Sequence, residues 1–382
     1  MENKNKIIAL CIIILILIGI GFIWIDSNYN ADIIKEPGFV EMGVLVPLTG
    51  FGDLGPKMQR GAELATEEIN EAGGINGKKI KLVYEDDQCK PETGVTAIKK
   101  LVEVDNIHII VGPLCSSVSL SVSPYAEQTQ TLIMNGGLAP KLRTAGDYIF
   151  RPIPGAEIIA GQHADFTFEE LNKRKTAFLF ANNDFGIGYT GAFKEQYEKI
   201  GGQISASEKY SAGDSDFKTQ LIKIKETNPE AILIVGSPKE MGLASKQIME
   251  LGIKCQILLP PSAESPDLIS AGGQTVEGAI YSYGYSDKAS SKVKAKFIKE
   301  YTKRYGEDTS WHAAVGYDAV MIYAKALEEC NANTEETSCI KKAIYSLNYN
   351  GAQGKIEFDS YGDALLPITF KTIIGGKFVN YQ

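Results

Sequence analysis

The fold is decided early in the chain, where residues 40–46 read VEMGVLV and residues 57–71 read KMQRGAELATEEINE. The first run is largely apolar, which is typical of a buried strand, and apolar residues recur at helical spacing in the second run. The turn GGING at 73–77 separates this helix from a second predicted strand at 79–85. A strand, a helix and a strand in this order predict a βαβ unit, whose two strands lie parallel in one sheet.

The same alternation continues along the chain in two successive blocks. The first block adds a helix at 93–104 and a strand at 107–111. Strands of the second block are predicted at 176–181, 202–209, 231–235 and 256–259, with helices at 188–200, 217–227 and 238–251 between them. Two later helices are predicted at 292–305 and 313–329. We therefore expect an α/β fold of two lobes, each a parallel sheet flanked by helices.

Parallel sheets of this kind bind small molecules beyond the carboxyl ends of their strands. Two facing lobes would place a cleft between four loops. These loops lie at 112–117, 135–138, 181–185 and 236–238, and the last of them contains Ser237.

Composition excludes several classes of protein. The 382 residues include 23% charged residues, which is ordinary for a folded chain, and the formal net charge is −8. Because nucleic-acid binding needs a basic face, this acidic balance predicts no nucleic-acid partner.

Residues 7–25 form an unbroken apolar run that is long enough to span a membrane as a helix. Lysines precede the run, so we expect residues 1–6 to be a cytoplasmic stub and residues 26–38 a linker to an extracytoplasmic domain. This predicts a single-pass protein of the cell membrane. Two alternatives remain open: a cleaved signal peptide and a lipid anchor on Cys11.

An extracytoplasmic location permits disulfides among the five cysteines that follow the apolar run. Cys330 and Cys339 enclose a short polar stretch and look like a local staple. Cys89 and Cys115 flank a predicted helix and strand, and a bridge between them could contribute ~3 kcal/mol. Cys255 would be left over, as a buried thiol among apolar neighbours.

Catalytic and cofactor motifs are weak. The three histidines have no metal-ligand spacing, and His108 lies inside a predicted strand. Gly186–Gly191 spell GxGxxG, but residues 182–185 separate that match from the strand, whereas a dinucleotide site needs the first glycine in the turn itself. We expect no metal, no cofactor and no enzyme activity; a dehydrogenase is the enzyme alternative.

Several short segments, in this order and spacing, carry a family resemblance. They are GVLVPLTG at 43–50, RGAELA at 60–65, INEAGGING at 69–77, EDD at 85–87, VGPLCSS at 111–117, LAP at 138–140, DFGIG at 184–188 and GYDAV at 316–320. From about Val40 onward the chain resembles the leucine/isoleucine/valine-binding proteins of ABC transporters, which have the type I periplasmic-binding-protein fold.

The resemblance implies how the chain is divided and what it binds. Residues 39–151 and 280–355 would form one lobe, and residues 152–279 and 356–382 the other. The disulfide of leucine-binding relatives falls on Cys89 and Cys115. The partners would be a small ligand, an ABC permease and its ATPase.

The resemblance also places the ligand residues, with departures from the family pattern. The serine that binds the ligand carboxylate falls on Ser116, beside Ser117. The backbone next to the ligand ammonium falls on 136–138, that is Gly136, Gly137 and Leu138, where relatives have Thr in place of Leu138. The rings that cover the ligand fall on Phe185 and near Leu54.

The acidic residue that pairs with the ligand ammonium falls on Pro261. Glu264 could replace it, and His312 falls close to the cleft. We therefore expect a solute-binding protein for a branched-chain or other hydrophobic amino acid, or for a related small carboxylate or amide. The alternative is a ligand-sensing receptor domain that acts with a separate signalling partner.

Overall fold

The structure is a computed structural model that describes residues 38–285 and 291–381. Residues Val40–Gln382 form one compact unit. In the part of the chain that the structure describes, no helix combines the length and apolarity needed to cross a membrane. The predicted stub at 1–6 and anchor at 7–25 lie outside the described residues, as does nearly all of the linker.

The first sheet has five strands in the order β2-β1-β3-β4-β5, and all of them are parallel. The strands are β1 (Val40–Val46), β2 (Ile80–Asp86), β3 (Ile109–Val111), β4 (Leu132–Met134) and β5 (Ile149–Phe150). The helices that connect them are α2 (Leu54–Glu71), α3 (Pro91–Lys99), which continues as a π-helical turn to Val104, and α4 (Ser116–Gln128). The predicted βαβ unit is therefore confirmed, with β1 and β2 as neighbours.

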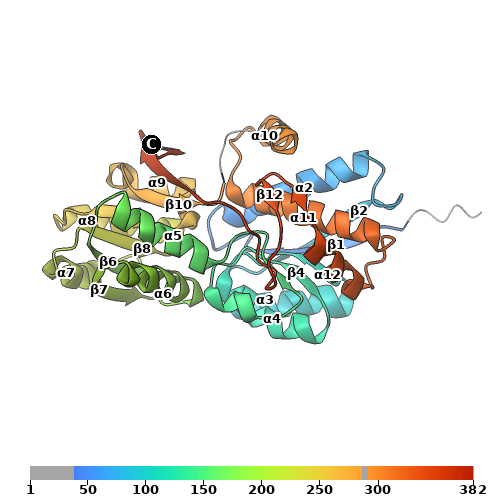
Figure 1. Cartoon of the computed structure of the whole chain (residues 1–382), viewed down its shortest axis with the longest axis horizontal. Coiled ribbons are helices and arrows are strands. Elements are labelled where there is room, and N and C mark those ends of the chain that lie inside the picture. The colour runs from blue at the N-terminus through green and yellow to red at the C-terminus, as the bar shows by residue number, and fades with distance from the viewer. Residues whose placement is uncertain (1–37, 286–290, 382) are drawn as a thin grey trace, which may run out of the picture. The chain divides into compact units, whose positions relative to one another are not determined.

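The second sheet has seven strands in the order β14-β13-β10-β9-β8-β6-β7. The strands are β6 (Lys175–Ala181), β7 (Gln203–Tyr210), β8 (Ala231–Val235), β9 (Gln256–Leu259), β10 (Ile280–Tyr283), β13 (Thr369–Ile374) and β14 (Lys377–Asn380). Its helices are α5 (Ala156–Glu169), α6 (Asp184–Lys199), α7 (Lys218–Glu226), α8 (Pro238–Glu250) and α9 (Pro266–Gly272). Figure 1 shows this sheet with its helices on the left and the first sheet on the right.

The second sheet is parallel from β10 to β7, as expected, but it has an antiparallel edge that the sequence did not predict. Strand β13 runs antiparallel to both β10 and β14. A two-residue turn joins β13 to β14 through Gly375 and Gly376, both with positive φ, as a tight hairpin requires.

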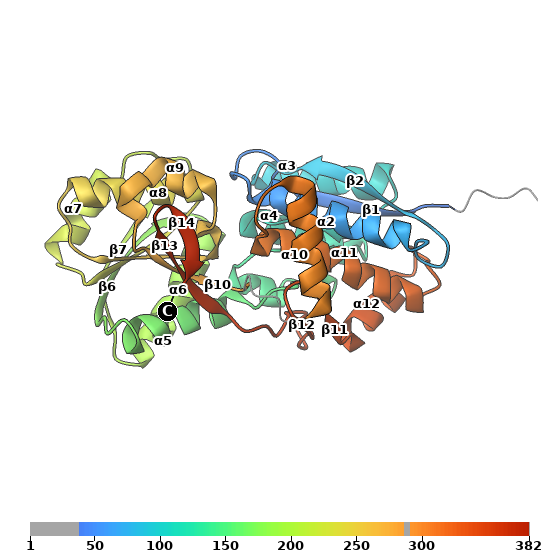
Figure 2. The same cartoon turned by 90° about the horizontal axis from the view of Figure 1, so that it is seen from above.

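The last helices return to the first sheet. They are α10 (Lys292–Tyr305), α11 (Trp311–Glu329) and α12 (Thr337–Ser346), and the strand pair β11 (Tyr349–Asn350) and β12 (Lys355–Ile356) follows them. Helix α11 packs on α2, as Figure 2 shows from above. A Cβ on Gly61 would lie 1.8 Å from the carbonyl oxygen of Ala313, and one on Gly316 would lie 1.9 Å from that of Met58. Only glycine permits this close approach of the two helices.

The lobe boundaries stay a prediction, with one change. Strand β10 belongs to the second sheet, so the boundary expected at residue 280 moves beyond Tyr283. Both expected disulfides are present, Cys89–Cys115 and Cys330–Cys339. The left-over Cys255 is half-buried, and burial raises the pKa of its thiol to about 12, which keeps it protonated and unreactive.

Candidate ligand-binding site

A cavity of about 280 Å³ lies where loops after strands of both sheets meet the start of α11. Small-molecule sites generally have roughly 300–1,000 Å³, so this cavity suits a small ligand. The lining residues are Phe51, Cys89, Pro91, Leu114, Cys115, Ser116, Ser117, Gly136, Leu138, Ile153, Asn183, Phe185, Ala212, Pro261, Ser262, Trp311, His312 and Val315. Three of the four predicted cleft loops contribute to this lining; the loop at 236–238 does not.

One wall is the start of α4, where Ser116 follows the disulfide-bonded Cys115. The Ser116 Oγ accepts hydrogen bonds from the backbone N–H groups of Leu138 (2.9 Å) and Ala139 (3.0 Å). A hydroxyl that accepts two such bonds still has its own proton to donate. The first N–H groups of a helix lack intrahelical acceptors and carry the positive end of the helix dipole, so this wall favours an anionic group.

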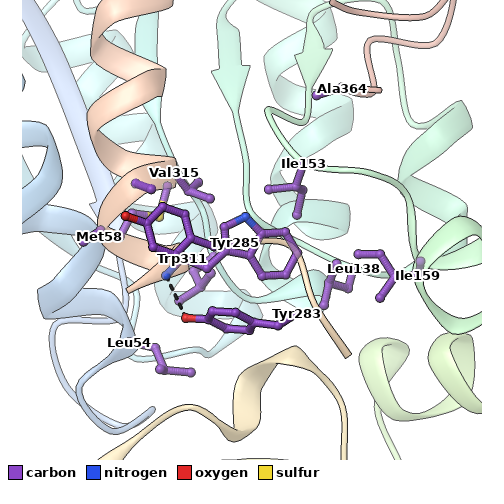
Figure 3. Packing of buried hydrophobic residues seen from close by; sticks show 14 of the residues in the cluster. Leu54, Met58, Leu138, Ile153, Ile159, Tyr283, Tyr285, Trp311, Val315 and Ala364 are labelled. Atoms are coloured by element: carbon purple, nitrogen blue, oxygen red, sulfur yellow. Dashed lines mark hydrogen bonds between the residues drawn. The ribbon is translucent and has the colours of Figure 1, made fainter. Parts of the chain in front are cut away.

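Apolar side chains form most of the remaining surface. Figure 3 shows Leu138, Ile153, Trp311 and Val315 in this region, with Leu54 and Met58 at the left of the view. Trp311 is held at two points: its backbone N–H donates to the Tyr283 Oη (2.7 Å), and its indole N–H donates to the Gln353 Oε1 (2.6 Å). These bonds fix the indole ring, so the apolar wall is preformed.

The lining contains no Asp, Glu, Lys or Arg among the residues that the structure describes. The one ionisable side chain of another type in this wall, apart from the disulfide cysteines, is His312, which is 8% exposed. Burial, together with the nearby Lys57 ammonium, lowers the pKa of His312 to about 4. Its Nδ1 has no hydrogen-bond partner. The imidazole is therefore neutral near pH 7, and the cavity as a whole is uncharged.

The structure brings five of the predicted site residues together in this cavity: Ser116, Ser117, Gly136, Leu138 and Phe185. Their roles toward a ligand stay predictions. Gly137 is adjacent in sequence but does not line the cavity. Ser117 also connects the two sides, because its Oγ accepts a bond from the Asp184 N–H (3.4 Å) at the start of α6.

Two other predicted residues lie elsewhere. Leu54 is fully buried in the core, and Phe51, three residues earlier, forms the cavity wall instead. Ser237 caps α8, forming a capping box with Glu240, and lines a second, more polar cavity. This cavity shares Phe51, Cys89, Asn183, Phe185 and Ala212 with the first. An aromatic residue between two glycines, Gly50 and Gly52, was the sequence feature that could have indicated Phe51.

Glu264 does not line the cavity. Its carboxylate accepts a hydrogen bond from the Tyr281 hydroxyl (2.6 Å) and forms an ion pair with Lys371 (2.8 Å). Both members of this ion pair are at least nine-tenths buried. Because β13 supplies Lys371, the partner of Glu264 comes from the C-terminal hairpin, which the sequence did not indicate.

The GxGxxG match, Gly186–Gly191, lies inside α6. A Cβ on Gly186 would lie 2.0 Å from the Ala181 carbonyl oxygen, so this glycine allows close packing of the helix start against β6. That is the structural role expected of a glycine at a helix start.

Comparisons with known proteins agree with this geometry. Residues 40–365 match the family described as periplasmic binding protein. A Leu/Ile/Val-binding protein homolog of Brucella abortus is 27% identical over 335 residues, which cover 86% of this chain and 88% of the relative. A leucine-, isoleucine-, valine-, threonine- and alanine-binding protein of Pseudomonas aeruginosa is 27% identical over 328 residues, covering 85% and 87%.

Among solved structures, a leucine-binding protein of Thermotoga maritima superposes with a TM-score of 0.85 at 27% identity. The match covers 90% of this chain and 97% of that protein. A branched-chain amino acid substrate-binding protein of Streptococcus pneumoniae, in complex with isoleucine, gives a TM-score of 0.82 at 25% identity, covering 89% and 97%. With its two-sheet fold and the family match over most of its length, this chain belongs to the periplasmic binding protein family.

Proposed function

We propose that this protein is the extracytoplasmic solute-binding component of an ABC importer. It captures a hydrophobic amino acid, or a related small carboxylate or amide, and presents it to a permease and its ATPase. The observation that carries this proposal is the cavity that the two sheets share, with the Ser116 hydroxyl and the start of α4 on one side and a fixed indole on the other. Relatives named for binding branched-chain amino acids support the same class of function.

The cavity suits capture rather than chemistry. It has a hydroxyl donor and apolar walls, and its described lining residues include no carboxylate or amine and a single imidazole, His312, whose pKa of about 4 is poorly matched to acid–base chemistry near pH 7. Segments cross between the two sheets after β5 and before β13, so the lobes can close on a ligand about these connections. A permease would then distinguish the loaded from the empty form.

Titration calorimetry of the full chain in detergent tests this function, with a panel of hydrophobic amino acids, matching carboxylic acids and amides. At least one compound is expected to bind with a micromolar or lower Kd. Ser116→Ala should weaken that binding at least tenfold, because it removes the hydroxyl donor. Ser121→Ala is the matched control, since Ser121 lies on the same helix, does not line the cavity and donates to the Val118 carbonyl.

Fluorescence gives an independent measurement of the same event. The chain has two tryptophans, Trp24 and Trp311. In a Trp24→Phe variant, emission comes from Trp311 in the cavity wall alone, so a bound ligand should change it. If no compound of the panel produces heat or changes the emission, the proposed function is wrong.

We also propose that residues 7–25 anchor the protein in the cell membrane, with the binding domain outside. The support is the length of the apolar run and the lysines that precede it. The full chain is expected to stay with membranes after a carbonate wash and to retain its N-terminal residues. A shortened chain in the soluble fraction would contradict the anchor and favour a cleaved signal peptide.

A further inference from the structure

The uncharged cavity constrains the chemical class of the ligand. A zwitterionic amino acid brings two charges into a site, and each buried charge needs a partner. The start of α4 and the Ser116 hydroxyl can serve a carboxylate. The question is what could serve an ammonium group beside it.

Of the carboxylates close to the cavity wall in sequence, Asp184 is 37% exposed and lies 3.8 Å from the Lys141 ammonium, and two others, Asp53 and Glu264, are already engaged. Asp53 forms an ion pair with Lys57 (2.6 Å) and accepts a hydrogen bond from the Ser265 hydroxyl (2.6 Å). Glu264 is paired with Lys371 and Tyr281. Neither residue lines the cavity. An ammonium group that recruited one of them would leave a buried lysine without its carboxylate.

The wall contributed by the residues after β9 is also without charge. Pro261 and Ser262 line the cavity there, and the Ser262 hydroxyl donates to the Gly236 carbonyl (3.2 Å). Proline has no side-chain acceptor, and the neutral His312 supplies no negative charge. A buried ammonium would therefore find only dipoles in this cavity, whereas a carboxylate finds a hydroxyl donor and a helix N-terminus.

We propose that the cavity selects a small hydrophobic monocarboxylate that lacks an α-ammonium group, over the amino acid with the same side chain. This inference rests on the proposed function, because it names the ligand class of the same site. The carboxylate lies at Ser116, and the hydrocarbon part packs against Phe51, Phe185 and Trp311.

Matched pairs of ligands test the inference on the unmodified full chain. One pair is leucine and 4-methylpentanoate, and the other is phenylalanine and 3-phenylpropanoate; the members of each pair differ only in the amino group. The acid of at least one pair is expected to bind at least tenfold more tightly than its amino acid. It should also bind more tightly than the corresponding neutral amide, because the amide lacks the negative charge that the start of α4 favours.

Each other outcome overturns the inference in a recognisable way. Amino acids that bind as tightly as their matched acids, or more tightly, contradict it while leaving the proposed function in place. An amide that binds best shows that the site selects a neutral molecule, which also contradicts it. If no acid, amino acid or amide binds, the inference falls together with the proposed function.

Changing Pro261 tests whether the absence of a negative charge in this wall causes the preference for an acid over an amino acid. Pro261→Glu places a carboxylate in the wall, so it should weaken binding of the acid at least tenfold and shift the preference toward the amino acid. Pro261→Gln has the same shape without the charge and should not reverse the preference. Ser270→Glu adds the same charge at an exposed position of α9 and should change neither affinity. An unchanged preference in a folded Pro261→Glu variant contradicts the inference; if that variant does not fold, the matched pairs decide alone.

Discussion

Two regions that lie where the two sheets meet, the cavity and a cluster beside the crossover segments, differ in their polar groups. The cavity is uncharged along its described lining. The second region, here named the crossover cluster, consists of Arg143, Arg151, Asp318, Gln353 and Asp363, beside the segments that pass between the sheets. Arg151 makes two hydrogen bonds of 2.5 Å to the Asp363 carboxylate, and the two side chains are 0% and 1% exposed.

The difference shows where each region obtains its specificity. Paired charges with defined directions fix one arrangement of the chain at the crossovers, since a misplaced partner would leave a buried charge alone. The described lining of the cavity has no such charged pairs and can discriminate by shape and by uncharged polar groups, above all the donors at α4. Trp311 belongs to both regions, because its indole N–H binds Gln353, whose side chain also donates to the Pro152 carbonyl (3.0 Å).

The largest loss of stability is expected when one charge is removed from the crossover cluster. Arg151→Met should destabilise the protein by about 3–5 kcal/mol, because it leaves Asp363 buried with only the more exposed Arg143 as a charged partner. Denaturant unfolding measures this loss. Adding Asp363→Leu to the first change should recover much of the loss; a double variant that is no more stable than Arg151→Met would contradict the charge-pair explanation.

The two disulfides distinguish an effect on stability alone from an effect on stability and ligand binding together. Replacing Cys89 and Cys115 by serine should cost about 3 kcal/mol of unfolding free energy and also weaken ligand binding, because both residues line the cavity. Replacing Cys330 and Cys339, which close a shorter loop, should cost somewhat less and leave binding unchanged. Equal effects of the two changes on binding would show that the first bridge does not position Ser116.

The pH dependence of stability tests whether the crossover cluster contains a poorly solvated charge. Burial raises the pKa of Asp318 to about 7, although the N–H groups of Gln353 and Ala352 partly oppose this. In the unfolded chain this carboxyl titrates at about 3.9, so the folded protein binds more protons than the unfolded chain between that pH and pH 7. Protonation of Asp318 therefore stabilises the folded protein at low pH, and this stabilisation is lost as the pH rises through 7.

Asp318→Asn cannot undergo that loss. Relative to the unmodified protein, its unfolding free energy should therefore rise by about 2 kcal/mol between pH 5 and pH 8. Any constant cost of the amide cancels in this difference, as does the titration of His163 and His312, which is common to both proteins. A difference that does not change with pH would mean that Asp318 is ionised throughout.

The smallest expected effect comes from a charge pair outside both regions. Lys81 and Glu41 form an ion pair of 2.7 Å on neighbouring strands, with side chains that are 56% and 38% exposed. Lys81→Met should change the unfolding free energy by less than about 0.5 kcal/mol. A loss as large as that of Arg151→Met would show that the charge itself, and not its burial, accounts for the strength of the crossover cluster.

Some elements could be predicted to the residue from an apolar run or a helical period. Strands β1, β8 and β9 and helix α10 begin and end where the sequence analysis placed them. Helix α4 was not predicted, because its residues 116–128 are rich in serine and include Pro124, which gives no amphipathic pattern. Strand β13 was missed because antiparallel pairing with β10 depends on a partner far away in sequence.

The site could be predicted in part. Ser116 and Phe185 lie within five residues after the ends of β3 and β6, so the topology of the sheets places them at the cavity. Leu54 and Phe51 show the limit of this reasoning: the two residues stand three apart at the start of α2, and only the packing of that helix decides which of them turns to the cavity and which to the core.

The ion pair of Glu264 with Lys371 has a consequence for how the chain is made. Synthesis proceeds from the N-terminus, so Glu264 exists long before Lys371 does. Until the C-terminal hairpin is complete, the second sheet lacks β13 and β14, and Glu264 lacks this partner. A chain that terminates before residue 371 would therefore lack both the antiparallel edge of the second sheet and the lysine that pairs with Glu264.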